Sequence, residues 1–204
     1  MKEKHLITYK IFKVVLGIVF TLYYRPKYIN KKSIPKDGPI IFCGNHMHLF
    51  DQNLVCLSTK RMVHYMAKIE YFQSKKTAWF FRLAGCIPVN REIHDKSAKE
   101  EGLKLLRKGY ALGIFPEGTR NKTNDFLLPF KYGPVSLAQK TNATIIPFAI
   151  TGQYKFLNNH LNIRFGEGFK VDSNMNLEDA NKKLFNKVKE LKQEGIKAIK
   201  EGEI

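Results

Sequence analysis

A histidine and an aspartate lie five residues apart in the segment NHMHLFD, directly after an apolar run at residues 39–44. A carboxylate can hold one imidazole nitrogen and leave the other to take a proton from a substrate hydroxyl. Positions five apart do not share a helix face, so a turn must intervene for His46 and Asp51 to meet. His48 is a rival base, but its spacing to Asp51 predicts a helix side chain that faces elsewhere. Taken alone, such a pair is a weak signal.

A second polar cluster, FPEGTR, follows the apolar run at residues 111–115. Gly118 permits a tight turn with exposed backbone N–H groups, and Arg120 can bind a phosphate with two hydrogen bonds. Alone, this cluster would suit a charged surface turn. Two more cations follow apolar runs, Lys68 after MVHYMA and Arg91 at the end of GCIPVNR. A single cation in such a place is usually solvated, but four polar strand ends together predict a site for a phosphorylated substrate.

The sequence lacks the motifs of several other classes of enzyme. There is no GxSxG nucleophile elbow and no Walker loop. The six histidines show no HExxH or zinc-finger spacing, so no metal is expected. A His–Asp pair without an enzyme nucleophile suits direct attack by a substrate alcohol on an acyl donor. The three cysteines, Cys43, Cys56 and Cys86, lie in apolar contexts and predict buried thiols in a reducing compartment.

The composition is that of one globular domain with a large positive charge. The chain has 204 residues, with 35 Lys and Arg against 18 Asp and Glu, a net charge of +17. Residues 1–42 hold nine basic and two acidic side chains, whereas residues 170–204 hold eight and seven. The excess predicts an anionic partner: nucleic acid, an acidic membrane surface, or an acidic or phosphorylated molecule. No basic groove-reading element or interleaved aromatic series is present, so nucleic acid is not expected.

Apolar runs and helical patterns alternate along the body of the chain. Strands are expected over 39–44, 62–67, 86–89, 111–115, 144–150 and 162–165, and helices over 51–59, 70–83, 97–108, 133–140 and 177–199. This alternation predicts a single α/β domain with a mostly parallel central sheet flanked by helices. The polar clusters then follow strands at one edge of the sheet, where such folds bind ligands.

Residues 6–24, LITYKIFKVVLGIVFTLYY, are expected to form a hydrophobic helix before this domain. Only 11 residues separate Lys13 from Arg25, against about 20 needed to span a membrane, and no signal-peptide cleavage site follows. The favoured interpretation is a helix in the membrane interface, with basic groups at anionic headgroups. The alternatives are packing on its own domain and a single tilted span. We assign residues 1–29 to a membrane-anchoring segment and 30–204 to the catalytic domain.

Four blocks of this sequence together resemble the 1-acyl-glycerol-3-phosphate acyltransferase (lysophosphatidate acyltransferase) family. NHMHLFD is similar to its NH-x4-D block, GCIPVNR to the block ending in Arg, and FPEGTR to the third block in full. The stretch IIPFAITG is similar to the fourth, with Pro147 at the expected place. The resemblance runs from about Ile34 to Gly168. The four blocks are specific in this order and spacing, whereas any one alone is not.

The resemblance implies a glycerol-3-phosphate acyltransferase-like fold and an acyl-transfer reaction. A fatty acyl chain would move from acyl-carrier protein or coenzyme A to the sn-2 hydroxyl of lysophosphatidate, giving phosphatidate. Lysophosphatidate, the acyl thioester and anionic membrane lipids are then the expected partners, with no bound cofactor. The resemblance implies that the reaction takes place at the cytoplasmic face of the cell membrane.

The resemblance also implies roles for individual residues. It makes His46 the general base and Asp51 its orienting partner, and it makes Arg91 a phosphate-binding residue. Lys68 lies outside the blocks, and we add it as a phosphate ligand because it stands at a strand end. The block FPEGTR would help form the acceptor site through Glu117, Gly118, Thr119 and Arg120.

Two departures from the family pattern bear on the acceptor. Gln52 stands where many relatives carry Pro or Trp, and Asn121 where Ser is frequent. One alternative is therefore the same chemistry on glycerol 3-phosphate or another lysolipid. A second is a non-catalytic basic module that binds membrane or nucleic acid, but it would leave the His–Asp pair unexplained.

Overall fold

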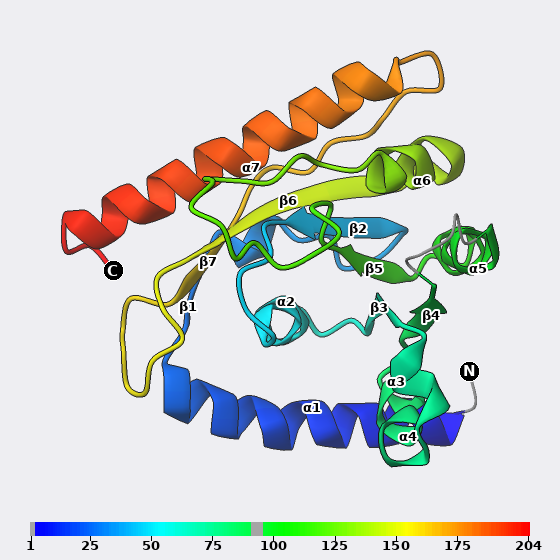
Figure 1. Ribbon diagram of the computed structural model, residues 1–204, viewed down its shortest axis with the longest axis horizontal. Coiled ribbons are helices and arrows are strands. Elements are labelled where there is room, and N and C mark those ends of the chain that lie inside the picture. Colours follow the sequence, from blue (N-terminus) through cyan, green and yellow to red (C-terminus); the bar gives the residue numbers. More distant parts are fainter. Residues whose placement is uncertain (1–2, 91–95) are drawn as a thin grey trace.

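A seven-stranded sheet runs through the middle of the molecule (Figure 1). The computed structural model describes residues 3–90 and 96–204. The strands are β1 (Lys27–Ile29), β2 (Ile40–Gly44), β3 (Val63–Lys68), β4 (Ile87–Val89), β5 (Ala111–Ile114), β6 (Thr144–Thr151) and β7 (Asn162–Phe165). Their order is β1-β7-β6-β2-β5-β3-β4, and every neighbouring pair is parallel except β6 with β7. The predicted mostly parallel α/β sheet is confirmed.

Helices cover both faces of this sheet. They are α1 (Glu3–Tyr24), α2 (Asp51–Ser58), α3 (Glu70–Gln73), α4 (Lys75–Leu83), α5 (Lys96–Arg107), α6 (Gly133–Thr141) and α7 (Leu177–Lys200), with a 3-10 turn, η1 (Lys31–Ser33). In Figure 1, α6 and α7 lie on one side of the sheet, and α1 and α2 lie on the other. The single helix expected over 70–83 is divided, because Ser74 has extended backbone angles between α3 and α4.

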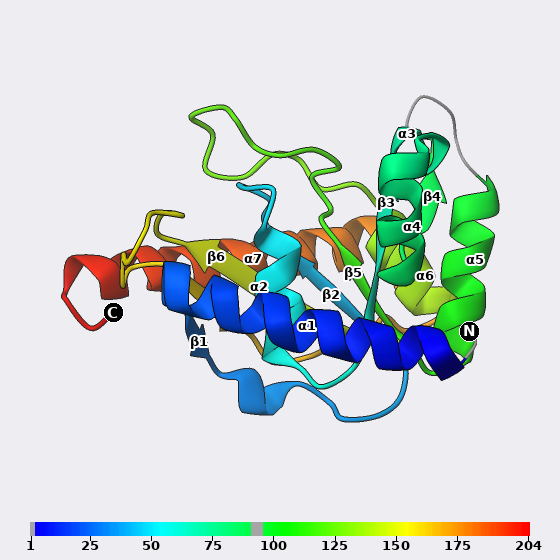
Figure 2. The same ribbon diagram turned by 90° about the horizontal axis from the view of Figure 1, so that it is seen from below.

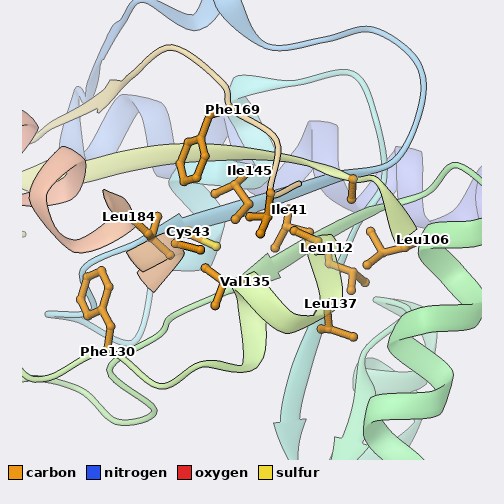
Figure 3. Packing of buried hydrophobic residues seen from close by; sticks show 14 of the residues in the cluster. Ile41, Cys43, Leu106, Leu112, Phe130, Val135, Leu137, Ile145, Phe169 and Leu184 are labelled. Carbon is orange, nitrogen blue, oxygen red and sulfur yellow. The ribbon is translucent and has the colours of Figure 1, made fainter. Parts of the chain in front are cut away.

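Strand β2 is buried on both faces, as its unbroken apolar sequence predicts. Successive side chains of a strand point to opposite sides. Ile41 and Cys43 therefore join the core beneath α5, α6 and α7, which Figure 3 shows from close by. Ile40 and Phe42 join the second core, beneath α1 and α2. All four side chains are almost completely buried.

Helix α1 packs on the domain through one narrow stripe of side chains. Tyr9, Gly17 and Phe20 are buried, and their separations of eight and three residues, about two turns and one turn, place them on a single face. At Gly17 the helix comes so close to α2 that an added Cβ would lie 2.5 Å from the Leu57 side chain. Figure 2 shows α1 lying across this side of the molecule.

Lys13 belongs to the same inward stripe. Its ammonium group donates to the carbonyl oxygens of Thr59, at 2.6 Å, and Arg61, at 3.1 Å. Burial lowers the pKa of Lys13. The lysine that interrupts the hydrophobic segment therefore stabilises the packing of α1 against the end of α2, where we had expected headgroup contact.

The opposite side of α1 is apolar and exposed. Its large exposed hydrophobic side chains include Ile11, Val14, Val15, Ile18, Val19 and Leu22. Within the described part of the chain, no helix is both long and apolar enough to cross a membrane. Packing of α1 on its own domain is thus observed for one face only. Contiguous exposed apolar surface of this kind marks contact with a membrane or another protein.

Residues 27–29, which we had placed in the anchoring segment, form β1 and pair with β7 at the edge of the sheet. The chain therefore enters the sheet immediately after α1.

Candidate active site

The polar clusters meet at one edge of the sheet. Strands β2, β3 and β5 are mutually parallel, so their carboxyl ends lie side by side. His46 follows β2, Lys68 ends β3, and the segment FPEGTR follows β5. A pocket of about 400 Å³ opens there, and His46, Lys68, Thr119 and Arg120 are among the residues that line it.

His46 and Asp51 form a hydrogen-bonded pair. The Nδ1 atom of His46 lies 2.7 Å from Oδ2 of Asp51, so Nε2 is the nitrogen available to substrate. The histidine side chain is 16% exposed, whereas the aspartate side chain is completely buried. Residues 45–50 form the turn that the sequence requires, and α2 begins at Asp51.

Asp51 accepts three further hydrogen bonds. The backbone N–H groups of Met47 and His48 donate to Oδ2 at 2.7 and 2.8 Å. The hydroxyl of Tyr154 donates to Oδ1 at 2.6 Å. A buried carboxylate is stable only when it is fully hydrogen-bonded, and these donors meet that need on both oxygens. His48 contacts Asp51 through its backbone rather than its ring, so the pair is His46–Asp51.

His46 is held in place by its main chain and by ring stacking. Its N–H donates to Oε1 of Glu117 at 2.8 Å, and its carbonyl oxygen accepts from the N–H of Asn121 at 2.7 Å. The imidazole stacks on Phe115, with ring centroids 4.1 Å apart and planes inclined by 13°. The segment that follows β5 therefore fixes the position of His46.

Glu117 accepts hydrogen bonds from two backbone N–H groups. It is 4% exposed, and its second oxygen accepts from the N–H of Leu128 at 2.9 Å. Burial raises the pKa of Glu117, and the two N–H donors partly oppose that rise. Glu117 lines a second, smaller cavity that His46 also borders, and it is absent from the lining of the 400 Å³ pocket.

The other predicted residues divide into three groups. Thr119, Arg120 and Lys68 line the pocket, so the structure brings them together with His46. Gly118 has a φ of +73°, a left-handed conformation that glycine adopts without strain, and forms the tight turn expected there. Arg91 lies outside the described residues. The roles of all these residues in substrate binding stay predictions.

Asn45 begins the block NHMHLFD, although no role was predicted for it, and Tyr154 lies outside the four blocks. Asn45 pairs its side-chain amide with both backbone groups of Ile150, at 2.9 and 2.7 Å, and so ties the start of the His46 turn to β6. Tyr154 follows β6 by three residues, at the same edge of the sheet as the other clusters. The signal in the sequence that marks Tyr154 is its place shortly after an apolar run, which it shares with the predicted polar clusters.

The remaining wall of the pocket is mostly apolar. It is formed by α1, α2, α4 and β3, and its residues include Leu16, Phe20, Leu57, Val63, Tyr65, Phe80 and Phe81. A volume of about 400 Å³ lies in the usual range for small-molecule sites. Among the described residues, no group of three His, Cys, Asp or Glu side chains is placed to hold a metal ion. The site thus joins the His46–Asp51 pair, an apolar wall and four cationic side chains, those of Lys13, Lys68, Arg120 and Lys122.

Comparison with known proteins agrees with this geometry. A family model described as acyltransferase matches residues 25–151, more than half of the chain. The chain belongs to the acyltransferase family. This acyltransferase is 33% identical over 147 residues to the 1-acyl-sn-glycerol-3-phosphate acyltransferase of Bacillus subtilis, covering 71% of each chain. The family assignment made from the four blocks is confirmed, and the chain is an acyl-group transferase enzyme.

Two further relatives extend the comparison. The acyltransferase is 32% identical over 142 residues to the 1-acyl-sn-glycerol-3-phosphate acyltransferase of Borreliella burgdorferi, covering 69% of this chain and 56% of that protein. The crystal structure of the 1-acyl-sn-glycerophosphate acyltransferase PlsC from Thermotoga maritima aligns with a TM-score of 0.75 at 22% identity. That alignment covers 98% of this chain and 84% of the other, and it shows that the two share a fold.

Replacing Glu117 by Gln should destabilise the acyltransferase. The amide offers one acceptor oxygen to the two N–H donors of His46 and Leu128, so one buried donor is left unpaired. We expect the free energy of unfolding to fall by about 1–3 kcal/mol, measured by urea denaturation followed by circular dichroism. Glu167→Gln, at an exposed position, is the matched control. An equal effect of both substitutions would contradict the role given to Glu117.

The same variant tests the pH dependence of stability. Burial raises the pKa of Glu117 above its ordinary value of 4.5, so the folded chain keeps a proton that the unfolded chain has lost. Stability therefore falls as pH rises from the unfolded value through the folded one. The wild type should lose more stability over that interval than Glu117→Gln, which cannot titrate there. Urea midpoints measured across this pH range would show the difference.

Proposed function

We propose that this acyltransferase moves a fatty acyl chain from a thioester to the sn-2 hydroxyl of 1-acyl-glycerol 3-phosphate, giving phosphatidate. The observation that carries the proposal is the His46–Asp51 pair beside a pocket whose lining combines cationic side chains with a mostly apolar wall. The printed names of the Bacillus and Borreliella relatives support the acceptor.

The geometry suits direct transfer between the two substrates. Nε2 of His46 takes the proton of the acceptor hydroxyl while the hydroxyl oxygen attacks the thioester carbonyl. Asp51 holds Nδ1–H and stabilises the imidazolium that forms. The C–S bond then breaks, and the leaving thiolate takes the proton back from the imidazolium. No covalent intermediate on the enzyme is required.

The pocket favours an amphiphilic phosphorylated acceptor. Lys68 and Arg120 lie on its lining with His46, where they can bind a phosphate, and the apolar wall can accept an acyl chain. Glycerol 3-phosphate shares the phosphate but has no acyl chain to fill that wall. Lysophosphatidate therefore fits the lining better than this alternative acceptor does. Both acyl-carrier protein and coenzyme A thioesters belong in the test as donors.

Replacing His46 by Ala should abolish most of this activity. We expect kcat for phosphatidate formation to fall between about 100- and 10,000-fold, the usual contribution of a general base. His160→Ala is the matched control, because His160 binds the carbonyl oxygen of Ile204 and does not line the pocket. Purified protein would be incubated with lysophosphatidate and either thioester, and circular dichroism would check folding. A His46→Ala enzyme as active as the wild type would refute the proposal.

Replacing Lys68 or Arg120 should weaken binding of the phosphorylated acceptor. A hydrogen bond to a charged group contributes about 1.5–3 kcal/mol, so Lys68→Gln or Arg120→Gln should raise KM for lysophosphatidate between about 10- and 100-fold. Monoacylglycerol, which lacks the phosphate, should be used poorly and be little affected. Lys60→Gln, at an exposed position outside the pocket lining, is the control. Adding glycerol 3-phosphate and another lysolipid to the panel tests the alternative acceptors, and an equal rate with all of them would contradict the assignment.

We further propose that α1 lies in the interface of the cell membrane at its cytoplasmic face. Two observations support this location: the exposed apolar side of α1 and its position beside the pocket that would receive a lipid. Basic residues around α1, including Lys10 and Arg25, would meet anionic headgroups. The helix would then lie along the surface with its inner stripe on the domain.

Replacing Val15 and Val19 together by Asp should weaken binding to vesicles of anionic phospholipid. Both valines are more than half exposed, and each contributes about 1.5 kcal/mol when buried, so we expect a loss of about 100-fold in a sedimentation assay. The control is Asn186→Asp with Gln193→Asp at exposed positions of α7, which adds the same negative charge elsewhere. Equal binding by the two double variants would argue against an interfacial α1.

A further inference from the structure

The two oxygens of the Asp51 carboxylate are held by different parts of the chain. Oδ2 receives its hydrogen bonds from the three consecutive residues 46–48. Oδ1 receives its bond from the hydroxyl of Tyr154, more than 100 residues away in the sequence. We propose that Tyr154 is a positioning residue for acyl transfer, which acts through Asp51 to keep His46 aligned. This inference rests on the proposed function of His46 as the base.

The ring of Tyr154 is fixed on several sides. It stacks on His48, with centroids 4.1 Å apart and planes inclined by 21°. From α1, Tyr24 contacts it edge-on at 5.5 Å and Phe20 at 6.4 Å. A ring held this way places its hydroxyl at a defined point, so the hydroxyl can fix the carboxylate that it contacts.

The backbone that carries Tyr154 is also attached to α1. In Figure 1 the loop between β6 and β7 reaches toward the C-terminal end of α1. There the N–H of Leu157 donates to the carbonyl oxygen of Tyr23 at 2.8 Å, and Phe156 packs on the Tyr23 ring at 4.7 Å. The position of the hydroxyl is therefore set by α1 and the β6–β7 loop as well as by the His48 ring, so it does not depend only on the turn that holds Oδ2.

Loss of the hydroxyl leaves Oδ1 buried and without this donor. The carboxylate can then rotate about its remaining bonds, which lengthens the contact between Oδ2 and Nδ1 of His46. A misplacement of about 1 Å at a reacting group can cost a factor of 100 in rate. Because Tyr154 acts on the base rather than on the substrate, the loss should fall on kcat and leave KM nearly unchanged.

The test compares Tyr154→Phe with Tyr28→Phe. The first variant keeps the ring and its contacts and removes only the hydroxyl bound to Asp51. The second removes a buried hydroxyl for which no hydrogen-bond partner is found among the described residues, from the same packed cluster. We expect kcat to fall between about 10- and 100-fold in Tyr154→Phe, with KM unchanged, and neither constant to change in Tyr28→Phe.

A proton NMR measurement provides a readout that does not need activity. The Nδ1–H proton of His46 should give a downfield resonance, assigned by its absence from His46→Ala. In Tyr154→Phe this resonance should move upfield and exchange faster with water, because the bond to Asp51 has lengthened. In Tyr28→Phe it should stay where it is in the wild type.

Each outcome bears on the proposal. A Tyr154→Phe enzyme with wild-type kcat and an unmoved resonance overturns it, as does an equal loss in Tyr28→Phe. A downfield shift of this resonance in Tyr154→Phe, with kcat unchanged, also overturns the proposal. It would mean that the Tyr154 hydroxyl only withdraws negative charge from Asp51 and does not align His46. If the wild type transfers no acyl chain although the resonance responds as expected, the proposed function fails while the link from Tyr154 to the His–Asp pair stands.

Discussion

The buried carboxylate of Asp51 is the constraint around which the active-site edge is arranged. An ionised carboxylate without water must have donors on both oxygens, or its burial costs several kcal/mol. Donors from residues 46–48 can reach Oδ2 only if the chain turns tightly between β2 and α2. That turn places the His46 imidazole over Phe115 and makes Asp51 the first residue of α2, where the helix dipole favours a negative charge. The geometry of the His46–Asp51 pair therefore follows from satisfying the hydrogen-bonding needs of one buried carboxylate.

A second buried carboxylate, that of Glu117, connects this turn to the segment after β5. It accepts N–H groups from His46 and Leu128, so the two loops cannot move independently without leaving a donor unpaired. The same segment carries Thr119 and Arg120 into the pocket. The block FPEGTR thus has two physical roles: Glu117 holds the main chain of His46, and Thr119 and Arg120 line the pocket.

Much of this arrangement could be predicted from the sequence, because it depends on local patterns. Unbroken apolar runs mark strands buried on both faces, such as β2, and parallel strands bring the residues behind them to one edge. Strand β1 could not be predicted, because three residues are too few to show an alternation of apolar and polar side chains. They form a strand because they pair with β7. The burial of the Glu117 side chain and the contact of the Tyr154 hydroxyl with Asp51 depend on partners distant in the sequence. No local sequence pattern indicates such partners.

Helix α1 shows why the hydrophobicity of a segment does not by itself reveal what the segment contacts. Its inner stripe, with Phe20 and the amine of Lys13, packs on the domain, while valines and isoleucines remain on the other side. Leu16 and Phe20 also line the pocket, and Phe20 touches Tyr154. One helix therefore separates an apolar pocket from an apolar outer surface and supports the residue that holds Asp51. Because these contacts lie on different faces, the outer valines do not line the pocket, whereas Phe20 lines it and also touches Tyr154.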